Sequence, residues 1–238
     1  MTTVTVTCIM PTADRPAFLP KAIAGFQAQD YPERELLVLD DGEESVERLV
    51  PRDDPRIRYR REAPGLSLGA KRNLACEEAR GEIIAHWDDD DWYAPWRLSC
   101  QVRKMIRGGA DICGLDRVMF VDFRSPGAWE YVYPPRGRPW VHGATLCYRR
   151  EIWRRNPFPP VKVGEDTRFV WNAAGARIRA LPDNRFYVGT IHDSNTSRKC
   201  VTDPRWHRIP LGEVRRAMGR DWPASAQTPG PLLECRHG

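Results

Sequence analysis

Short apolar runs alternate with amphipathic segments along the first half of the chain. Thr and Val alternate in residues 2–10 before the sequence becomes wholly apolar, which predicts a strand that stops at Pro11. Residues 35–40 (ELLVLD) predict a second buried strand. A helical pattern separates the two, so a right-handed crossover and a parallel sheet are expected. In such sheets ligands bind beyond the carboxyl ends of the strands, here at Pro11–Thr12 and Asp40–Asp41.

The first helix is predicted by apolar side chains at Leu19, Ile23 and Phe26, which share one face. Asp14 is its candidate N-cap, and Pro16 lies near its first turn. Further helices are expected over residues 45–50, 70–79, from 95 onward, 151–155, 165–175 and 212–218, and further strands over 56–60, 82–87, 110–114, 117–123, 143–150, 176–181 and 185–192. This layout predicts one α/β domain, with a mixed, mostly parallel sheet flanked by helices, of the Rossmann-like nucleotide-binding type.

The composition changes over residues 124–140, which are rich in turn-forming residues and aromatic side chains. Such a segment is typical of a loop or hairpin that forms a recognition surface, and aromatic faces stack well on sugars. Trp140 and His142 are therefore candidate acceptor contacts. Trp129, Tyr131 and Tyr133 follow a period of two, so they also fit one buried face of a strand, and the pattern does not decide between the two.

Composition limits the class of protein. With 238 residues, 41% of them apolar and 29% charged, the chain suits one globular domain. No apolar run approaches the roughly 18 residues of a membrane span, and the N-terminus leads directly into a strand pattern, so a cytoplasmic location is expected. Seven cysteines without a CxxC pair suggest neither a disulfide framework nor a zinc cluster, and most are expected in the core.

The net charge of +5 comes from interleaved acidic and basic residues, which argues against nucleic-acid binding. One basic section near the C-terminus fits contact with an anionic membrane surface, an anionic acceptor or a solvated face. Its members are Arg198, Lys199, Arg205, Arg208, Arg215, Arg216 and Arg220.

Four adjacent carboxylates, Asp88–Asp91, follow the predicted strand 82–87 and precede a Trp, Tyr and Pro cluster. A buried strand would deliver them to a cleft, where a hard divalent cation would neutralise them. Mg²⁺ takes one or two protein carboxylates and fills its other positions with water and substrate phosphates. The alternative is an acidic loop that caps the helix beginning at Pro95.

Several segments in order resemble the family 2 glycosyltransferases of GT-A fold. They are CIMPTADR, FQAQDYPERELLVLDDG, KRNLACEEARGEIIAHWDDDDWYAPWRL, GEDTRF and IHDSNTS, between Val4 and Ser197. The resemblance implies an inverting enzyme that uses Mg²⁺ or Mn²⁺ to move a sugar from a nucleotide diphosphate donor, by family weight UDP, to an acceptor hydroxyl. A carbohydrate, a lipid-linked molecule or a natural product would serve as acceptor.

The resemblance also implies roles for the acidic residues. Asp88 would face the ribose or the metal, and Asp90, third in the DxD triple, would be the main protein ligand, while Asp91 equally fits an N-cap of the next helix. His192 would complete the metal shell or touch the diphosphate, although a histidine at a strand end is often only a polar terminus. Asp89 is expected on the nucleotide sugar.

Asp166 would be the general base, and Glu165 would orient the loop or bind the acceptor. Both residues also open a predicted helix, where acidic side chains favour the N-terminal end of the dipole. Lys71 and Arg72 resemble a basic pair that approaches the diphosphate, with a solvated helix face as the alternative. The nucleotide contacts implied are Pro11, Thr12, Asp14, Asp41, Lys71, Arg72, Asp88 and Asp89.

The domain organisation follows from the same segments. Residues 1–200 would form the glycosyltransferase domain, with 1–123 as its nucleotide-binding half and 124–200 as its acceptor and catalytic half. Residues 201–238 would be a C-terminal extension. Two other functions are alternatives: a catalytically silent nucleotide-sugar or carbohydrate-binding protein, and a sugar nucleotidyltransferase, whose Gly-rich phosphate loop is missing from PTADRPAF.

Overall fold

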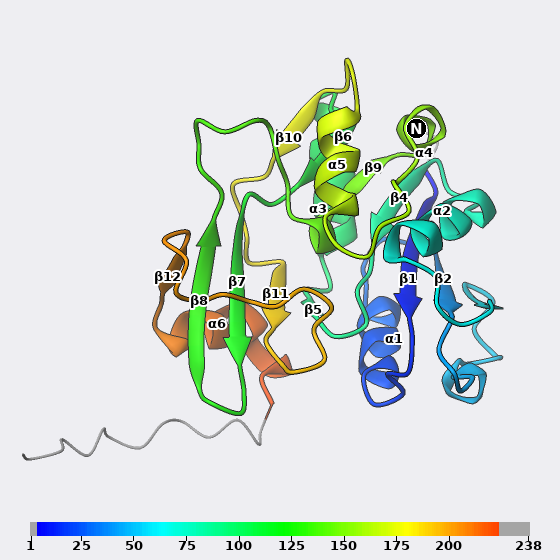
Figure 1. Ribbon diagram of the computed structural model, residues 1–238, viewed down its shortest axis with the longest axis horizontal. Helices are drawn as coiled ribbons and strands as arrows, with labels where there is room; N and C mark the ends of the chain where they lie inside the picture. Colours follow the sequence, from blue (N-terminus) through cyan, green and yellow to red (C-terminus); the bar gives the residue numbers. More distant parts are fainter. Residues whose placement is uncertain (1–3, 224–238) are drawn as a thin grey trace, which may run out of the picture.

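A seven-stranded sheet forms the centre of the computed structural model, which describes residues 4–223 (Figure 1). Its strand order is β10 (Ile178–Ala180), β6 (Ile112–Gly114), β9 (Cys147–Arg149), β4 (Ile83–His86), β1 (Val6–Thr12), β2 (Arg34–Asp40) and β3 (Ile57–Arg61). β9 runs antiparallel to both of its neighbours, and the other adjacent strands are parallel. The mixed, mostly parallel sheet confirms the predicted fold class.

Strand β1 continues through Pro11 to Thr12, so the prediction that it stops at Pro11 is wrong. Its pairing with β4 ends at Ile9 and His86, whereas its pairing with β2 continues to Thr12 and Asp40. Alternate residues of a strand bond to opposite neighbours. Pro11 would bond on the β4 side, where no ladder remains, so its missing N–H costs nothing. Residues 2 and 3 of that predicted strand lie outside the described range.

Helices cover both faces of the sheet. The alternating apolar side chains of β1 and β2 place α1 (Leu19–Gln27) and α3 (Arg97–Arg107) against one face. The opposite face packs against α2 (Leu68–Glu78), α4 (Arg150–Arg155) and α5 (Glu165–Asn172). The predicted helix at 45–50 is a short 3₁₀ turn, Glu47–Leu49. Five of the six cysteines in the described range are buried, as predicted for core residues, and Cys200 is exposed.

The apolar face predicted for the first helix is confirmed, and its predicted N-cap is wrong. Leu19, Ile23 and Phe26 are all buried. Asp14, however, lies five residues before the helix in a left-handed conformation, with φ 54°. Its Oδ1 accepts the backbone N–H of Glu43 at 2.7 Å. Asp14 therefore ties the end of β1 to the turn after β2, and the N-cap position falls to Phe18.

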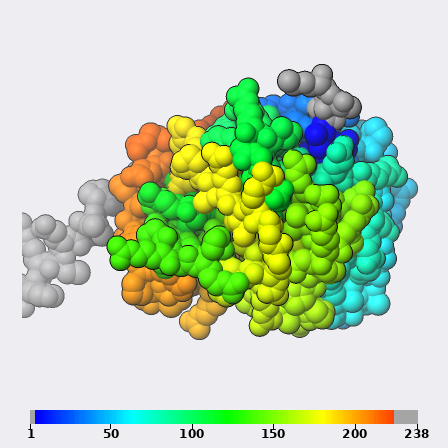
Figure 2. All heavy atoms as spheres, turned by 90° about the horizontal axis from the view of Figure 1, so that it is seen from above, coloured from blue at the N-terminus to red at the C-terminus, as the bar shows by residue number. Residues whose placement is uncertain are grey.

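A second sheet lies beside the first and was not predicted (Figure 1). Its order is β12 (Trp206–Arg208), β8 (Gly127–Val132), β7 (Arg117–Asp122), β11 (Tyr187–Thr190) and β5 (Trp92–Tyr93). β7 and β8 form the hairpin expected near residue 124, and α6 (Leu211–Met218) packs on them. Part of the predicted extension therefore pairs with this sheet. Figure 2 shows this orange C-terminal segment on the opposite side from the cyan β3–α2 region.

Candidate active site

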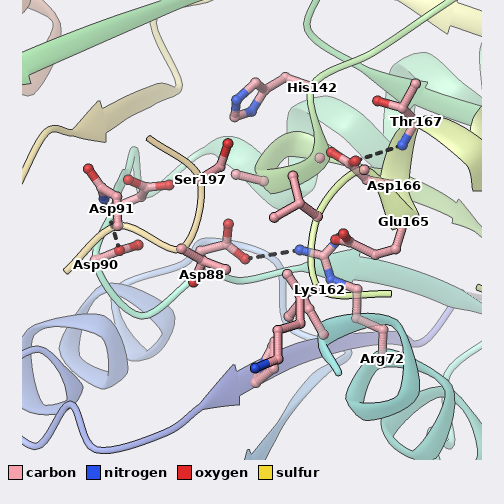
Figure 3. Close-up of a pocket in the computed structure, with 18 of the residues that line it drawn as sticks. Arg72, Asp88, Asp90, Asp91, His142, Lys162, Glu165, Asp166, Thr167 and Ser197 are labelled. Carbon is pink, nitrogen blue, oxygen red and sulfur yellow. Dashed lines mark hydrogen bonds and ion pairs between the residues drawn. The ribbon is translucent and has the colours of Figure 1, made fainter. Parts of the chain in front are cut away.

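A cleft of about 310 Å³ opens at the carboxyl ends of the central strands, between the two sheets. The aspartates that follow β4 form one wall, and the first turn of α5 forms the opposite wall (Figure 3). The predicted site residues on its lining are Pro11, Arg72, Asp88, Asp89, Trp140, His142, Glu165, Asp166 and Asp90. The acidic run and the predicted base therefore share one cleft, as crossover topology places them.

Arg72 lies between the two acidic walls. Its guanidinium approaches Asp88 Oδ1 at 3.5 Å and Glu165 Oε1 at 2.9 Å, and its side chain is only 4% exposed. A solvated helix face is therefore wrong for Arg72. Burial raises the pKa of Asp88 and raises that of Glu165 to about 7, and the Arg72 charge opposes both shifts. The guanidinium is thus held between two carboxyl groups, whose ionised forms are disfavoured by burial and favoured by its charge.

Arg15 connects two of the four aspartates to the loop after β11. Its Nη1 donates to Asp89 Oδ1 at 3.1 Å and to Asp90 Oδ2 at 2.9 Å, and its Nη2 donates to the Ser194 carbonyl. Thr12 Oγ1 donates to the other oxygen of Asp89 at 2.6 Å. Burial raises the pKa of Asp89 to about 6. Arg15 was missed from the sequence, although it ends the quoted CIMPTADR segment.

Asp90 and His192 meet as the resemblance implies. The distance from His192 Nε2 to Asp90 Oδ2 is 3.0 Å, and Asn195 Nδ2 lies 3.0 Å from the same imidazole nitrogen. Phe18 stacks on the imidazole at 4.7 Å. Burial works against the ionised form, but the hydrogen bond from His192 and the charge of Arg15 hold the pKa of Asp90 below its ordinary value.

Asp91 does not cap the next helix, so that alternative is wrong. Helix α3 begins at Arg97 without a side-chain cap. Asp91 instead accepts the Tyr187 hydroxyl at 2.6 Å and the Thr190 N–H at 2.9 Å, both from β11. Burial and the neighbouring carboxylates raise its pKa well above the ordinary range. The fourth aspartate therefore anchors the second sheet to the acidic loop.

Asp166 lies in the first turn of α5, which starts after Gly164 in the left-handed conformation with φ 79°. Its Oδ1 accepts the Thr167 N–H at 2.6 Å, and its carboxylate points into the cleft (Figure 3). A Cβ built on Gly143 would lie 2.0 Å from Asp166 Oδ2. The carboxylate therefore rests directly against the Gly143 backbone.

Aromatic rings form the side of the cleft next to Asp166. Trp140 stacks on Tyr133 with centroids 4.7 Å apart, and Tyr131 contacts it edge-on. His142 lies beside Trp140, and burial with the Lys199 charge lowers the pKa of His142 to about 3, so its ring is neutral near pH 7. Tyr131 and Tyr133 are half-buried, so each ring both packs and presents surface.

Asp41 and Lys71 bind each other outside this lining. Lys71 Nζ donates to Asp41 Oδ1 at 2.6 Å, and the Leu66 N–H donates to Asp41 Oδ2 at 2.9 Å. Both side chains are buried, so a solvated face is wrong for Lys71 as well. Asp40, the last residue of β2, accepts the N–H groups of Gly42 and Val46. The contacts of Asp41 with Lys71 and Leu66 hold the loop before α2 at the edge of the sheet.

Two lysines of the cleft lining were also missed, Lys162 and Lys199. Lys199 belongs to the predicted basic section and lies 5.3 Å from the centroid of the Phe120 ring. The arginines of that section are exposed.

Over residues 4–223, no helix is long and apolar enough to cross a membrane. Within the same range, no three His, Cys, Asp or Glu side chains form a ready-made metal cluster.

Comparison with known families matches residues 7–158 to a model described as Glycosyl transferase family 2. The chain belongs to this family. It is 32% identical over 115 residues to GalNAc(5)-diNAcBac-PP-undecaprenol beta-1,3-glucosyltransferase of Campylobacter jejuni, covering 44% of this chain and 36% of that protein. It is 37% identical over 98 residues to the putative colanic acid biosynthesis glycosyl transferase WcaA of Escherichia coli, covering 40% and 35%. Thus the chain matches these family 2 relatives over about a third of their length.

Solved structures confirm the GT-A fold of this family 2 member. S. aureus TarS 1–349 in complex with UDP-GlcNAc has a TM-score of 0.65 at 20% identity, covering 90% of this chain and 64% of that one. The mannosyltransferase PcManGT from Pyrobaculum calidifontis, in complex with GDP-Man and Mn²⁺, has a TM-score of 0.61 at 22% identity, covering 79% and 56%. The matched family range ends before Asp166 and His192, so their roles rest on the cleft geometry.

Proposed function

We propose that this chain is an inverting glycosyltransferase that moves a sugar from a nucleotide diphosphate donor, UDP-linked, to an acceptor hydroxyl. The observation that carries the proposal is the arrangement of the cleft, in which Asp166 faces the acidic run from the opposite wall (Figure 3). Inversion by a single displacement needs one base on the acceptor side, and Asp166 has that place.

The chemistry can be assigned to residues of this chain. Asp166 takes the proton of the acceptor hydroxyl while the acceptor oxygen bonds to the anomeric carbon. The bond from that carbon to the diphosphate breaks, and its electron pair leaves with the nucleotide diphosphate. Arg72, Arg15 and Lys199 line the cleft and supply positive charge where the leaving group develops its negative charge.

A divalent cation, Mg²⁺ or Mn²⁺, fits beside Asp90 and His192. Carboxylate oxygens and neutral imidazole nitrogens are ligands that such ions accept. Asp90 Oδ2 and His192 Nε2 lie 3.0 Å apart and share a hydrogen bond, which a bound ion would replace. A bound ion would neutralise the developing charge of the diphosphate. Asp88, expected to face the ribose or the metal, lies beside Arg72. The PcManGT complex with GDP-Man and Mn²⁺ supports metal use.

The donor side of the proposal rests on the ends of β1 and β2. Pro11 lines the cleft, and Thr12 and Asp14 lie at the same strand end. Asp41 and Lys71 lie at the end of β2 and at the start of α2, so the nucleotide would lie along this edge. A UDP-linked donor is supported by the TarS complexes with UDP and with UDP-GlcNAc.

The acceptor side consists of the aromatic rings next to Asp166. Trp140, His142 and Glu165 line the cleft, and the Glu165 carboxylate is paired with Arg72. A flat indole favours the apolar face of a sugar ring. We therefore infer a saccharide acceptor, free or lipid-linked, and the Campylobacter relative is named for a polyprenol-linked saccharide.

The test is turnover of UDP-glucose, UDP-galactose, UDP-N-acetylglucosamine and GDP-mannose, with saccharides added as acceptors, by wild type and by Asp166→Asn. We expect nucleotide diphosphate release with at least one donor, lowered about 10²-fold or more in the variant, with donor affinity nearly unchanged. Asp53→Asn makes the same change at an exposed position and should retain full activity. Normal turnover by Asp166→Asn would remove Asp166 as the base, and no release from any donor by wild type would refute the proposed function.

A further inference from the structure

Two consecutive hydrogen bonds connect the aromatic side of the cleft to Asp166. Trp140 Nε1 donates to Thr167 Oγ1 at 3.0 Å. The backbone N–H of Thr167 donates to Asp166 Oδ1 at 2.6 Å. Thr167 thus uses its hydroxyl to hold the indole and its amide to hold the carboxylate, and it lies in the first turn of α5. Figure 3 shows the contact between Thr167 and Asp166.

The other contacts of Trp140 fix its ring in one orientation. Its face stacks on Tyr133 with 20° between the planes, and Tyr131 and His142 pack edge-on. The indole still lines the cleft, so a bound molecule can touch it. Because the indole is held in place and its N–H is bonded to Thr167, the ring restrains the first turn of α5.

The opposite side of Asp166 is confined by Gly143, whose missing Cβ leaves room for Oδ2. With Gly143 on one side and the Thr167 N–H on the other, the carboxylate keeps its direction only while the first turn of α5 keeps its position. The Gly164 before it has positive φ and open surroundings, so the entry to the helix supplies little restraint. The Trp140–Thr167 hydrogen bond is a direct restraint from the aromatic rings beside Asp166.

We propose that Thr167 and Trp140 are positioning residues for the base, an inference that rests on the proposed function. The indole supports the acceptor saccharide on its ring and, through its N–H, holds Thr167 and with it Asp166. The same side chain thus sets the place of the acceptor and the direction of the base. Neither Thr167 nor the indole N–H takes part in bond making.

The experiment removes each half of the Trp140–Thr167 hydrogen bond separately. Thr167→Val keeps the shape of the side chain and removes the acceptor oxygen, and Trp140→Phe keeps an aromatic ring and removes the donor. Thr167→Ser is the matched control, because it retains the hydroxyl. Turnover is measured as nucleotide diphosphate release from the four donors named above, with Mn²⁺ present, for each single variant and for the double variant.

We expect kcat to fall about fivefold to tenfold in Thr167→Val, the effect of one lost orienting hydrogen bond, with donor KM unchanged. Thr167→Ser should recover most of the loss. The double variant should be no slower than the slower single variant, because both changes remove the same bond. Binding of UDP by calorimetry should match wild type throughout, which shows that the donor site and the fold are intact.

Three results would overturn the inference while wild type is active: Thr167→Val with normal kcat, Thr167→Ser as slow as Thr167→Val, or losses that multiply in the double variant. Wild type that releases nucleotide from none of the four donors refutes the proposed function, and the inference falls with it. Failure of the proposed function is thereby distinguished from failure of the inference alone.

Discussion

Gly143 shows how a residue without a side chain can set the direction of the carboxylate that we propose as the base. It follows His142 at the start of a 3₁₀ turn, and its carbonyl accepts His86 Nδ1 at 2.8 Å. This hydrogen bond fixes the backbone of Gly143. Asp166 Oδ2 occupies the space where a Cβ would stand. Only glycine lets the carboxylate approach this closely.

Gly143→Ala should lower turnover sharply while the protein remains folded. A Cβ 2.0 Å from Asp166 Oδ2 must displace the carboxylate, and a shift of about 1 Å at a reacting group can cost about 10²-fold in rate. Steady-state kinetics with the donor that wild type uses would measure the loss. Gly212→Ala is the matched control, since its added Cβ meets only the tip of Arg216 at 3.8 Å. Equal activity of the two variants would contradict the proposed packing.

Glu165 gives a residue-scale prediction for pH. Burial raises its pKa from 4.5 to about 7 in the folded protein, with Arg72 opposing the shift. The folded state thus holds this proton more tightly than the unfolded state. The contribution of Glu165 to the free energy of unfolding is full below about pH 4.5 and is lost as the pH rises through about 7.

Glu165→Gln removes this titration. Loss of the ion pair with Arg72 lowers the free energy of unfolding of the variant. Above about pH 7, however, wild type loses on the order of 1–3 kcal/mol of its free energy of unfolding through the titration of Glu165, and the variant does not. Denaturant unfolding at pH 5 and pH 8 should therefore show the stability gap between the two proteins narrowing toward pH 8. The exposed Glu33→Gln should show no such change. A gap that widens toward pH 8 would contradict the raised pKa.

At the scale of elements, the sequence predicted the centre of the first sheet because β1 and β2 are seven-residue runs that are buried throughout. Parallel strands place their carboxyl ends at one edge, so the positions of Thr12, Asp41 and the four aspartates followed from the alternation alone. The second sheet escaped because β5 has two residues and β12 has three, too few for any periodicity. Its parallel pair joins Met119 to Val188, a contact that depends on tertiary packing.

The same limit explains the residues that were missed or misassigned. Arg15 and Asp89 are 74 residues apart, and Asp91 and Thr190 are 99 apart, so local patterns could not reveal either contact. The N-cap assignments of Asp14 and Asp91 failed because both carboxylates satisfy distant backbone N–H groups instead of the next helix. Local rules found acidic residues at the correct sheet edge, and packing determined which of them are structural.

At the scale of the whole molecule, the cleft joins three parts of the fold. The central sheet supplies the aspartates, α5 supplies Asp166, and the loop after β11 supplies Asn195, while His192 of that loop contacts Asp90 from behind the lining. In the described structure Arg15 connects the aspartates to that loop. A ligand that bridges these parts should therefore stabilise the folded chain as a unit, because it binds only when they are assembled.

UDP with Mn²⁺, at about 100 times its dissociation constant, should raise the free energy of unfolding by about 2.7 kcal/mol. A thermal melt would measure this shift, and adding EDTA should remove most of it. Asp90→Ala should lose the part that depends on Mn²⁺, because Asp90 and His192 converge at 3.0 Å and no other carboxylate contacts that imidazole nitrogen among the described residues. The control is Asp193→Ala, which changes the neighbour of His192, an aspartate whose side chain is 88% exposed. This variant should keep the full Mn²⁺-dependent shift in the free energy of unfolding. An Mn²⁺-dependent shift of wild-type size in Asp90→Ala would place the cation elsewhere along the acidic run, and a shift that EDTA leaves intact would argue for metal-independent binding held by Arg15 and Arg72 alone.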